Sequence, residues 1–300
     1  MKNKIKFLGM VALVAIIGFA VSCGDGGNNG TSNNGGDPQP FIAMVQIPET
    51  STTFTMGLEV FFTPIRQITL SSFSMSKYQV TQAQYQEVMG TNPSYFNGTA
   101  GREADSGEVQ SRRPIERVTW YDAIEFCNKL SVKEELTPVY TIEGRSPPSG
   151  YPIISATVTP NWSANGYRLP TEAQWEYACR AGSTTQWHFG DVEGTDNTGL
   201  RGYAWYTVNS NSKTHEVGKK LPNAFGLYDM HGNVWEWCWD WLGTYDAEDT
   251  TNPLGASSST QRVIRGGSLN SIAMNSRSAH RFAGLPDTND GDRGFRVVLP

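Results

Sequence analysis

Four tryptophans at alternate positions place the strongest constraint on how this 300-residue chain can fold. They are Trp235, Trp237, Trp239 and Trp241. Successive side chains of a strand point to opposite faces, so alternate tryptophans share one face of an extended segment. Each indole ring has a large apolar area to bury. The pattern predicts a strand in the core. Core packing is favoured over a sugar-stacking surface because Cys238, a residue type that is usually buried, lies on the other face.

A second constraint lies near the C-terminus, where two strand-like segments enclose a polar stretch. Arg262–Ser268 and Gly294–Leu299 combine Val, Ile or Phe with glycines, which is typical of strands that end in turns. Between them, Leu269–Asp292 is rich in Asn, Ser, Asp and Gly and has neither the helical nor the strand period. We expect the two outer segments to pair and to hold loops at a sheet edge. These loops either form the functional surface of the protein or are an ordinary connection between core strands.

Residues 1–22 are typical of a secretory signal. Three lysines within the first six residues precede an apolar run, Phe7–Val21, that is short for a membrane span. The sequence Ala-Val-Ser-Cys23 follows and resembles the cleavage site of bacterial lipoproteins, in which the cysteine becomes lipidated. We predict a lipoprotein signal peptide over 1–22 and lipidation at Cys23. The alternative is a plain signal peptide followed by an incidental cysteine.

The residues after Cys23 are predicted to form a tether. Residues 24–36 contain Gly, Asn, Asp, Ser and Thr and have no apolar side chain to bury. A disordered, lipidated, Gly/Asn-rich tether is therefore expected over 23–40. Residues 41–300 show no comparable change in composition, which indicates one large domain.

Charge and cysteine content argue against several classes of function. The formal net charge is −5, which gives no basic footprint for nucleic acid. The remaining cysteines, Cys127, Cys179 and Cys238, are odd in number and have apolar or aromatic neighbours, so buried free thiols are expected rather than disulfides. No Cys-x-x-Cys or His-x-x-x-His spacing supports a zinc or redox site.

Hydrophobic spacing and turn residues predict short strands and three helices. Strands are expected at Phe41–Ile47, Phe54–Met56, Ile65–Leu70 and Phe73–Val80, with a hairpin of Thr137–Ile142 and Ile153–Thr159. Helices are expected at Gln82–Met89, after Thr119 and after Thr171, with Thr81, Thr119 and Thr171 as N-caps and with Gly90 and Gly182 as stops.

Four motifs stand in order along the domain. They are Gly166–Ala178, Gly226–Trp237, Arg265–Ser268 and Gly294–Arg296. Together they resemble the formylglycine-generating enzyme, or sulfatase-modifying factor, family, and the resemblance covers nearly all of residues 41–299. It implies an α+β, C-type-lectin-like fold with a small sheet core, a few helices and high irregular content. Sugar binding does not follow from that fold name.

The resemblance does not extend to the activity of the family. Active members bind copper through a cysteine pair after the Arg-Gly-Gly-Ser motif and oxidise a substrate cysteine with oxygen. Ser271 and Ser276 take the matching positions, and an un-ionised serine is a poor ligand for copper(I), which prefers thiolates. Related sulfoxide synthases need a histidine cluster, whereas the histidines here are scattered in sequence, at His188, His215, His231 and His280. We expect no catalytic residue and no required cofactor.

The lipoprotein start, this scaffold and the irregular segment before Gly294-Phe-Arg296 also resemble the variable lipoproteins of diversity-generating retroelements. In that family, reverse transcription mutates adenines of a template repeat. Asparagine codons then yield many residue types but never Lys, Glu, Gln, Trp or Met. Leu269–Asp292 contains no Lys, Glu, Gln or Trp, and Met274 is the exception. The resemblance implies a variable region over about 265–299, with Arg265, Gly266, Gly267, Gly294, Phe295 and Arg296 as its fixed scaffold.

The same resemblance implies that ligand-binding side chains of the variable region point outward. The implied positions are Leu269, Asn270, Ser271, Ile272, Met274, Asn275, Ser276, His280, Phe282, Ala283, Gly284, Leu285, Thr288, Asn289, Asp290, Gly291 and Asp292. We expect Ile272, His280, Phe282 and Leu285 to be the main anchors. The expected partner is an unknown protein or other surface ligand, and the lipid anchor is expected to hold the protein in the bacterial outer membrane, exposed at the cell surface.

Family resemblance also implies a structural calcium site. Its ligands would be Asp229, Gly232, Val234 and Glu236. The alternative is that the two carboxylates cap turns or pair with arginines. Two other functions stay open, namely a catalytic member with unrecognised chemistry and an envelope lipoprotein with a fixed partner.

Overall fold

The computed structural model describes residues 41–58, 63–191, 198–245 and 248–300. The predicted signal peptide, Cys23 and the tether lie outside the described residues. The helices are α1 (Gln82–Met89), α2 (Trp120–Lys133) and α3 (Glu172–Arg180), with short 3-10 helices η1 (Gln110–Arg112), η2 (Thr198–Gly202) and η3 (Ala273–Ser276). The strands are β1 (Met44–Ile47), β2 (Phe54–Leu58), β3 (Thr63–Ile68), β4 (Phe73–Ser76), β5 (Tyr140–Ser146), β6 (Ser155–Pro160), β7 (Ala204–Trp205), β8 (His231–Gly232), β9 (Trp235–Trp241), β10 (Arg262–Arg265), β11 (Phe282–Gly284), β12 (Arg293–Gly294) and β13 (Val298–Leu299).

Each of these three α-helices begins at a threonine that caps it. The hydroxyl groups of Thr81, Thr119 and Thr171 accept a hydrogen bond from the backbone N–H three residues later, and the side chain of that later residue bonds back. This reciprocal arrangement satisfies two otherwise unpaired backbone donors, and it confirms the predicted helix starts. Within the described residues, no helix has both the length and the apolar character needed to cross a membrane.

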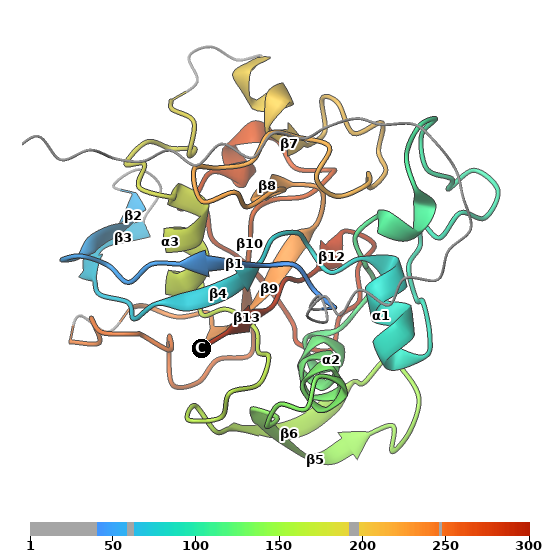
Figure 1. Cartoon of the computed structure of the whole chain (residues 1–300), viewed down its shortest axis with the longest axis horizontal. Helices are drawn as coiled ribbons and strands as arrows, with labels where there is room; N and C mark the ends of the chain where they lie inside the picture. Colours follow the sequence, from blue (N-terminus) through green and yellow to red (C-terminus); the bar gives the residue numbers. More distant parts are fainter. Residues whose placement is uncertain (1–40, 59–62, 192–197, 246–247) are drawn as a thin grey trace, which may run out of the picture. The chain divides into compact units, whose positions relative to one another are not determined.

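Two small sheets lie at the centre of the domain (Figure 1). The four-stranded sheet has the order β11-β10-β9-β12, in which β10 is antiparallel to both neighbours and β12 is parallel to β9. The three-stranded sheet has the order β1-β4-β13 and is antiparallel. Pairs β2-β3, β5-β6 and β7-β8 lie outside these sheets. Figure 1 shows α3 beside β9 and β10, with long irregular segments between the elements.

The strand β9 is buried on both faces. The side chains of Trp237 and Cys238, which are neighbours in the strand and so point in opposite directions, are both fully buried. Trp237 Nε1 donates a hydrogen bond to the carbonyl oxygen of Val118 at 3.0 Å, and Trp120 Nε1 donates to that of Cys238 at 2.9 Å. The predicted core strand is confirmed, and the indole N–H groups of Trp237 and Trp120 are satisfied by backbone oxygens.

The expected pairing of the two C-terminal segments is wrong. β10 pairs with β9 and β11, β12 lies on the opposite edge of β9, and β13 pairs with β4 in the other sheet. β11 itself forms inside the stretch that was expected to be loop. A buried strand must satisfy its backbone N–H and C=O groups on both edges. The two segments therefore lie on either side of β9 instead of against each other.

Candidate ligand-binding surface

Arg265 is the last residue of β10, and it anchors the start of the predicted ligand-binding segment, Leu269–Asp292, to α3. Its fully buried guanidinium pairs with two carboxylates, with Nε 3.2 Å from Glu172 Oε1 and Nη2 bonded to Glu176 Oε2. Nη1 donates to the carbonyl oxygens of Ser278 at 3.1 Å and His280 at 2.6 Å. A buried charge is tolerated when it is paired and hydrogen-bonded. This one side chain therefore fixes α3 and the backbone of the segment together.

Arg296 anchors the other end of the segment. Its Nε and Nη2 donate to the two oxygens of Glu236 at 2.6 and 2.8 Å, which makes a bidentate pair. Trp175 Nε1 also donates to Glu236 at 2.7 Å, and Arg296 Nη1 donates to the carbonyl oxygen of Ser76 at 3.1 Å. Bidentate arginine–carboxylate pairs are among the strongest hydrogen-bonded contacts in proteins. The pair joins β9, α3 and the three-stranded sheet.

The turn after β10 requires two consecutive glycines. Gly266 and Gly267 have φ of 94° and 78°, in the left-handed region that side chains disfavour. A Cβ at Gly267 would lie 2.5 Å from Ser276 Oγ, so a side chain there would collide with the segment. The predicted scaffold residues are all buried, namely Arg265, Gly266, Gly267, Gly294, Phe295 and Arg296. The segment thus leaves and re-enters the domain through buried residues.

Most of the predicted contact positions are at least partly open to solvent. The exposed ones are Asn270, Ile272, Met274, Phe282, Leu285 and Asp290, and the half-buried ones are Asn275, His280, Ala283, Thr288, Asn289, Gly291 and Asp292. The four apolar side chains among the exposed positions have exposed fractions of 54% (Ile272), 38% (Met274), 52% (Phe282) and 46% (Leu285). Large apolar side chains of this kind can anchor a ligand because their contact excludes water.

Four predicted contact positions point inward, which corrects the expectation that these side chains face solvent. Leu269 is 1% exposed and Ser276 is fully buried. Ser271 is buried because its Oγ accepts the N–H of Ser268 at 2.9 Å and closes a turn. At Gly284, a Cβ would lie 2.7 Å from a tryptophan ring of β9, so only glycine fits. In these positions a new side chain would disturb packing.

Trp235, which the sequence places only in the core, lies where several parts of the segment meet. Its ring is stacked 5.5 Å from the ring of Phe282 and lies 6.0 Å from that of His280, between centroids. The backbone N–H of Trp235 donates to the carbonyl oxygen of Asp292 at 2.8 Å. Asp292 Oδ2 in turn accepts from Ser268 Oγ at 2.9 Å. Alternate spacing alone groups this residue with the other tryptophans, although its place at the start of the strand was a signal that it borders the loops.

Two histidines that are distant in sequence are stacked under the segment. The rings of His188 and His231 are 4.9 Å apart and nearly parallel, and His188 Nδ1 is 2.8 Å from His231 Nε2. His231 Nδ1 is 2.6 Å from the carbonyl oxygen of Ser276 and must donate to it, so His231 Nε2 accepts from His188. Burial lowers the pKa of His188 to about 4, which keeps the pair neutral at physiological pH. The scattered histidines therefore include one contacting pair, and it supports the backbone of the segment.

A copper oxidase of this family needs ionised thiols as copper ligands, and the cysteines of the described residues do not supply them. Ser271 and Ser276, which match the copper-binding cysteines of active family members, are buried. Cys127, Cys179 and Cys238 are buried free thiols, as predicted. Burial raises the pKa of Cys179 to about 12 and also raises the pKa of the other two. A protonated thiol is a weak nucleophile and a poor metal ligand. The described residues thus supply no thiolate beside the two serines.

The predicted calcium ligands converge on one point. The carbonyl oxygens of Asp229, Gly232 and Val234 and Oε1 of Glu236 lie 3.3, 3.3, 3.1 and 2.9 Å from Gln79 Nε2. An amide NH2 group has two hydrogens and cannot satisfy four acceptors. Gln79 Oε1 is buried without a hydrogen-bond partner among the described residues, and exchanging the two amide atoms would add it as a fifth oxygen. An all-oxygen set of this kind suits calcium, so the residues fit the ion.

The alternative roles of the two carboxylates are also present. The Asp229 carboxylate accepts the N–H of Gly218 at 2.7 Å, so Asp229 turns only its carbonyl toward the other oxygens. Glu236 pairs with Arg296, as described above. Burial raises the pKa of Asp229 to about 6. One carboxylate therefore points to the shared centre, and that carboxylate is already paired with a cation.

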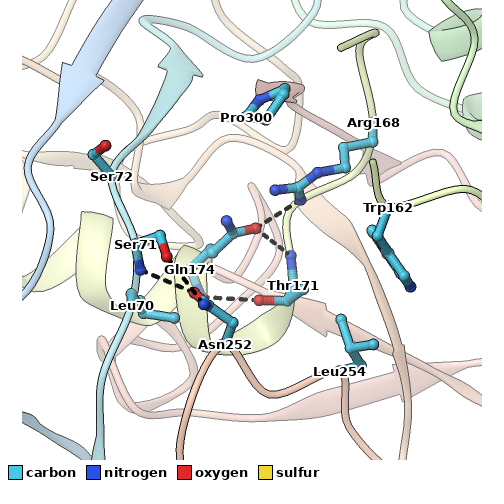
Figure 2. Close-up of a pocket in the computed structure, with 10 residues that line it drawn as sticks. All are labelled: Leu70, Ser71, Ser72, Trp162, Arg168, Thr171, Gln174, Asn252, Leu254 and Pro300. Carbon is cyan, nitrogen blue, oxygen red and sulfur yellow. Dashed lines mark hydrogen bonds between the residues drawn. The ribbon is translucent and has the colours of Figure 1, made fainter. Parts of the chain in front are cut away.

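A separate cavity of about 340 Å³ lies beside the chain end (Figure 2). It is lined by Leu70, Ser71, Ser72, Trp162, Arg168, Thr171, Gln174, Asn252, Leu254 and Pro300. The Arg168 guanidinium lies 5.5 Å from the centre of the Trp162 ring, and its Nη1 donates to Gln174 Oε1 at 2.8 Å. None of these lining residues is Asp, Glu, His or Cys, and none is a predicted contact position. The cavity offers no acid–base pair and is distinct from the candidate surface.

The comparisons with known proteins agree with this architecture. Residues 32–300 match the model of the sulfatase-modifying factor enzyme 1-like domain family, and the chain belongs to that family. A chaperone protein LppX from Paenibacillus barcinonensis is 38% identical over 256 residues, covering 78% of this chain and 82% of the relative. The formylglycine-generating enzyme of Mus musculus is 28% identical over 300 residues, covering 87% of this chain and 76% of the enzyme.

Solved structures confirm the fold class. Treponema denticola variable protein 1 is similar with a TM-score of 0.74 and 36% identity, covering 85% of this chain and 94% of that protein. PvdO from Pseudomonas aeruginosa has a TM-score of 0.64 and 27% identity, with coverage of 85% and 93%. The predicted α+β, lectin-like fold of the formylglycine-generating-enzyme type is confirmed, as is the resemblance to a variable protein.

Proposed function

We propose that this protein is a surface-displayed lipoprotein that binds ligands through Leu269–Asp292 on a rigid lectin-like scaffold. The observation that carries the proposal is the contrast between exposed Ile272, Phe282 and Leu285 and the buried ion pairs at both ends of the segment. Exposed side chains contribute little to stability, so they can change without loss of the fold. The ligand is an unknown protein or another surface molecule, and the net charge of −5 disfavours nucleic acid.

The proposal includes a source of variation, namely a diversity-generating retroelement that mutates adenines. It is supported by similarity to a protein named as variable and by the lack of Lys, Glu, Gln and Trp in Leu269–Asp292. In this proposal, burial limits which of the predicted positions vary. Leu269, Ser271, Ser276 and Gly284 are buried and are expected to stay nearly constant. The other predicted positions are the candidates for diversity.

A membrane anchor completes the proposed function. Cys23 follows the signal-like segment, and its lipidation would hold the chain on the bacterial outer membrane at the cell surface. The residues between Cys23 and the domain would act as a tether that leaves the binding surface free to reorient. Radiolabelled fatty acid should enter the wild-type protein in the native host. It should not enter a Cys23→Ala variant, and equal labelling of the two would rule out this anchor.

In this proposal the protein has no catalytic activity. Ser271 and Ser276 replace the cysteine pair of active relatives, and the buried thiols stay protonated. An envelope lipoprotein with a fixed partner is the competing function. The nucleotide sequence around the gene separates the two. A near-copy of the codons for residues 265–299 beside a reverse transcriptase gene, differing almost only at adenines, supports diversification. Without such a copy, a fixed partner becomes the better explanation.

We also propose a structural calcium ion held by the carbonyl oxygens of Asp229, Gly232 and Val234, Glu236 and the amide oxygen of Gln79. Calcium bound there would neutralise oxygens that now converge without enough donors. Chelator-treated protein should gain about 2–3 kcal/mol of stability when calcium is added at a hundredfold excess over its Kd. Thermal unfolding measures the gain, and a Gln79→Leu variant should lose it. Identical unfolding curves with and without calcium would rule the ion out.

A further inference from the structure

A second group of metal-ligating side chains lies apart from the calcium ligands. Asp105, Glu108 and His215 each place one ligand atom within 4.8 Å of the other two. Glu108 Oε1 is 2.8 Å and Asp105 Oδ2 is 3.7 Å from His215 Nδ1. The two carboxylates and the imidazole come from parts of the chain more than 100 residues apart, since Glu108 and His215 differ by 107 in residue number. For that reason no sequence spacing indicates this group.

The hydrogen bond on the far side of the imidazole sets its orientation. His215 Nε2 is 2.8 Å from the carbonyl oxygen of Ser210, and a carbonyl can only accept. Nε2 therefore carries a hydrogen. In the neutral ring, Nδ1 then directs its lone pair toward the carboxylates of Asp105 and Glu108. A histidine that donates its outer N–H to a backbone carbonyl is the usual arrangement in metal sites.

The two carboxylates are oriented in the same manner. Glu108 Oε2 accepts the backbone N–H of Glu216 at 3.2 Å, and Asp105 Oδ1 pairs with the ammonium of Lys213. In each carboxylate one oxygen is held by this outer partner and the other oxygen faces His215. Three electron-rich atoms thus face a shared point, and they repel one another unless a positive charge lies between them.

We propose that Asp105 Oδ2, Glu108 Oε1 and His215 Nδ1 bind a divalent transition metal, with zinc as the best match. Zinc commonly takes three nitrogen and oxygen ligands and keeps a fourth position for water. An imidazole favours such a metal over calcium, which prefers an all-oxygen set. The side chain of Asp105 is 36% exposed, which gives the metal a route from solvent. The competing arrangement is a protonated His215, stacked 3.7 Å from the Trp205 ring centre and paired with both carboxylates.

The location links this site to the candidate surface. Ser210, whose carbonyl oxygen orients His215, donates from its Oγ to the carbonyl oxygen of Leu269 at 2.7 Å. Thr207 N–H donates to the carbonyl oxygen of Ser271 at 3.0 Å. The loop that carries the imidazole therefore holds the first residues of the segment. A metal bound here would link that loop to the part of the chain that contains Asp105 and Glu108. The site stands independently of any ligand bound by the exposed side chains.

Isothermal titration of zinc into the metal-stripped, full-length chain tests the proposal. The expected result is one tightly bound equivalent at this site and a rise in the thermal midpoint. Asp105→Asn, Glu108→Gln and His215→Gln should each weaken zinc binding at least about tenfold. Glu143→Gln, which changes an exposed carboxylate in β5, is the matched control and should leave binding unchanged. Cobalt in place of zinc should give visible absorption bands of a nitrogen- and oxygen-ligated ion, and His215→Gln should change them.

Two results would overturn the proposal. One is the absence of zinc binding. The other is binding that Asp105→Asn and His215→Gln leave unaltered, because the zinc would then lie elsewhere. In either case a protonated His215 accounts for the contacts. Far-UV circular dichroism checks the fold of each variant. Should the buried His215 variant unfold, Asp105→Asn decides, because that side chain is partly exposed and its loss leaves the core intact.

Discussion

The buried frame, which consists of Arg265–Gly267 and Gly294–Arg296, differs from the segment Leu269–Asp292 between its two parts in where charged and apolar side chains lie. In the frame, the charged side chains of Arg265 and Arg296 are fully buried, and each pairs with a carboxylate. In the segment, the apolar side chains of Ile272, Phe282 and Leu285 are exposed to water. Buried ion pairs fix geometry because a charge without its partner is costly inside a protein. The contrast indicates that fold stability and recognition are carried by separate residues.

The largest expected effect comes from breaking the frame. Arg296→Met leaves the buried carboxylate of Glu236 without its cation and should cost about 3–5 kcal/mol of unfolding free energy. Urea denaturation followed by circular dichroism measures the loss. Phe282→Ser is the control from the segment and should change stability by about 0.5 kcal/mol or less. A loss below about 1 kcal/mol for Arg296→Met would mean that the frame does not depend on this pair.

A smaller effect separates the two kinds of position within the segment itself. Leu269 is buried and Ile272, three residues later, is exposed. Leu269→Ala should therefore cost about 2–4 kcal/mol, because it removes buried methyl groups and leaves a cavity. Ile272→Ala should cost about 0.5 kcal/mol or less. The same urea denaturation measures both. Equal losses for the two variants would show that burial does not divide this segment into fixed and variable positions.

The histidine pair at the boundary between frame and segment predicts a pH dependence. Because burial lowers the pKa of His188 to about 4, the unfolded chain binds a proton between about pH 6.5 and 4 that the folded chain does not. This contribution is fully present above pH 6.5 and is lost as the pH falls toward 4. At about 1.4 kcal/mol per pKa unit the full shift corresponds to about 3.5 kcal/mol, and the partial solvent exposure of His188 reduces this contribution to roughly 2–3 kcal/mol. Wild-type protein should lose that much more stability than His188→Gln across this range.

Chemical denaturation at several pH values measures the difference between the two curves. His231 is present in both proteins, so the difference reports mainly on His188. Burial also lowers the pKa of His231. For this reason the stability of the His188→Gln variant should still fall somewhat as the pH falls. Curves that run parallel from pH 7 to 4.5 would contradict the assignment of a buried, neutral His188.

Local signals in the sequence predict much of the scaffold. The capping threonines, such as Thr81, give the helix starts because a cap and its partner are three residues apart. The alternate tryptophans give β9 because the strand period is two. Buried free thiols such as Cys179 follow from an apolar context and an odd cysteine count. The helix starts and the strand are inferred from neighbours within a few residues, where covalent geometry limits the alternatives.

Features that depend on long-range contacts were not predictable in the same way. Nothing periodic in Leu269–Asp292 shows that Leu269 and Ser276 turn inward, because η3 and the turns around it set those directions. The stacking of His188 on His231 joins residues 43 positions apart. The wrong pairing of the C-terminal segments has the same origin, since β9 takes both of its edge partners from distant parts of the chain. Folding brings together groups that sequence distance separates.

The smallest expected effect on stability, counted per position, belongs to the four predicted anchors, and it should accompany the largest effect on binding. Replacing Ile272, His280, Phe282 and Leu285 together with serine should cost about 2 kcal/mol in total, at about 0.5 kcal/mol per position. If each anchor contributes at least about 1 kcal/mol to binding, the four together contribute at least about 4 kcal/mol, and affinity should fall at least about 700-fold. The assay is surface plasmon resonance against a partner selected on the wild-type protein from a displayed library.

A polar control set from the same segment makes this comparison specific. Serine at Asn270, Thr288, Asn289 and Asp290 changes as many side chains at its surface without removing an apolar anchor. If affinity survives in the control set but is lost in the anchor set, recognition depends on the four anchor side chains. Equal loss in both sets would shift recognition to the polar loops. Unchanged affinity in both sets would move the binding surface away from Leu269–Asp292, and the buried frame would then be holding this segment for another purpose.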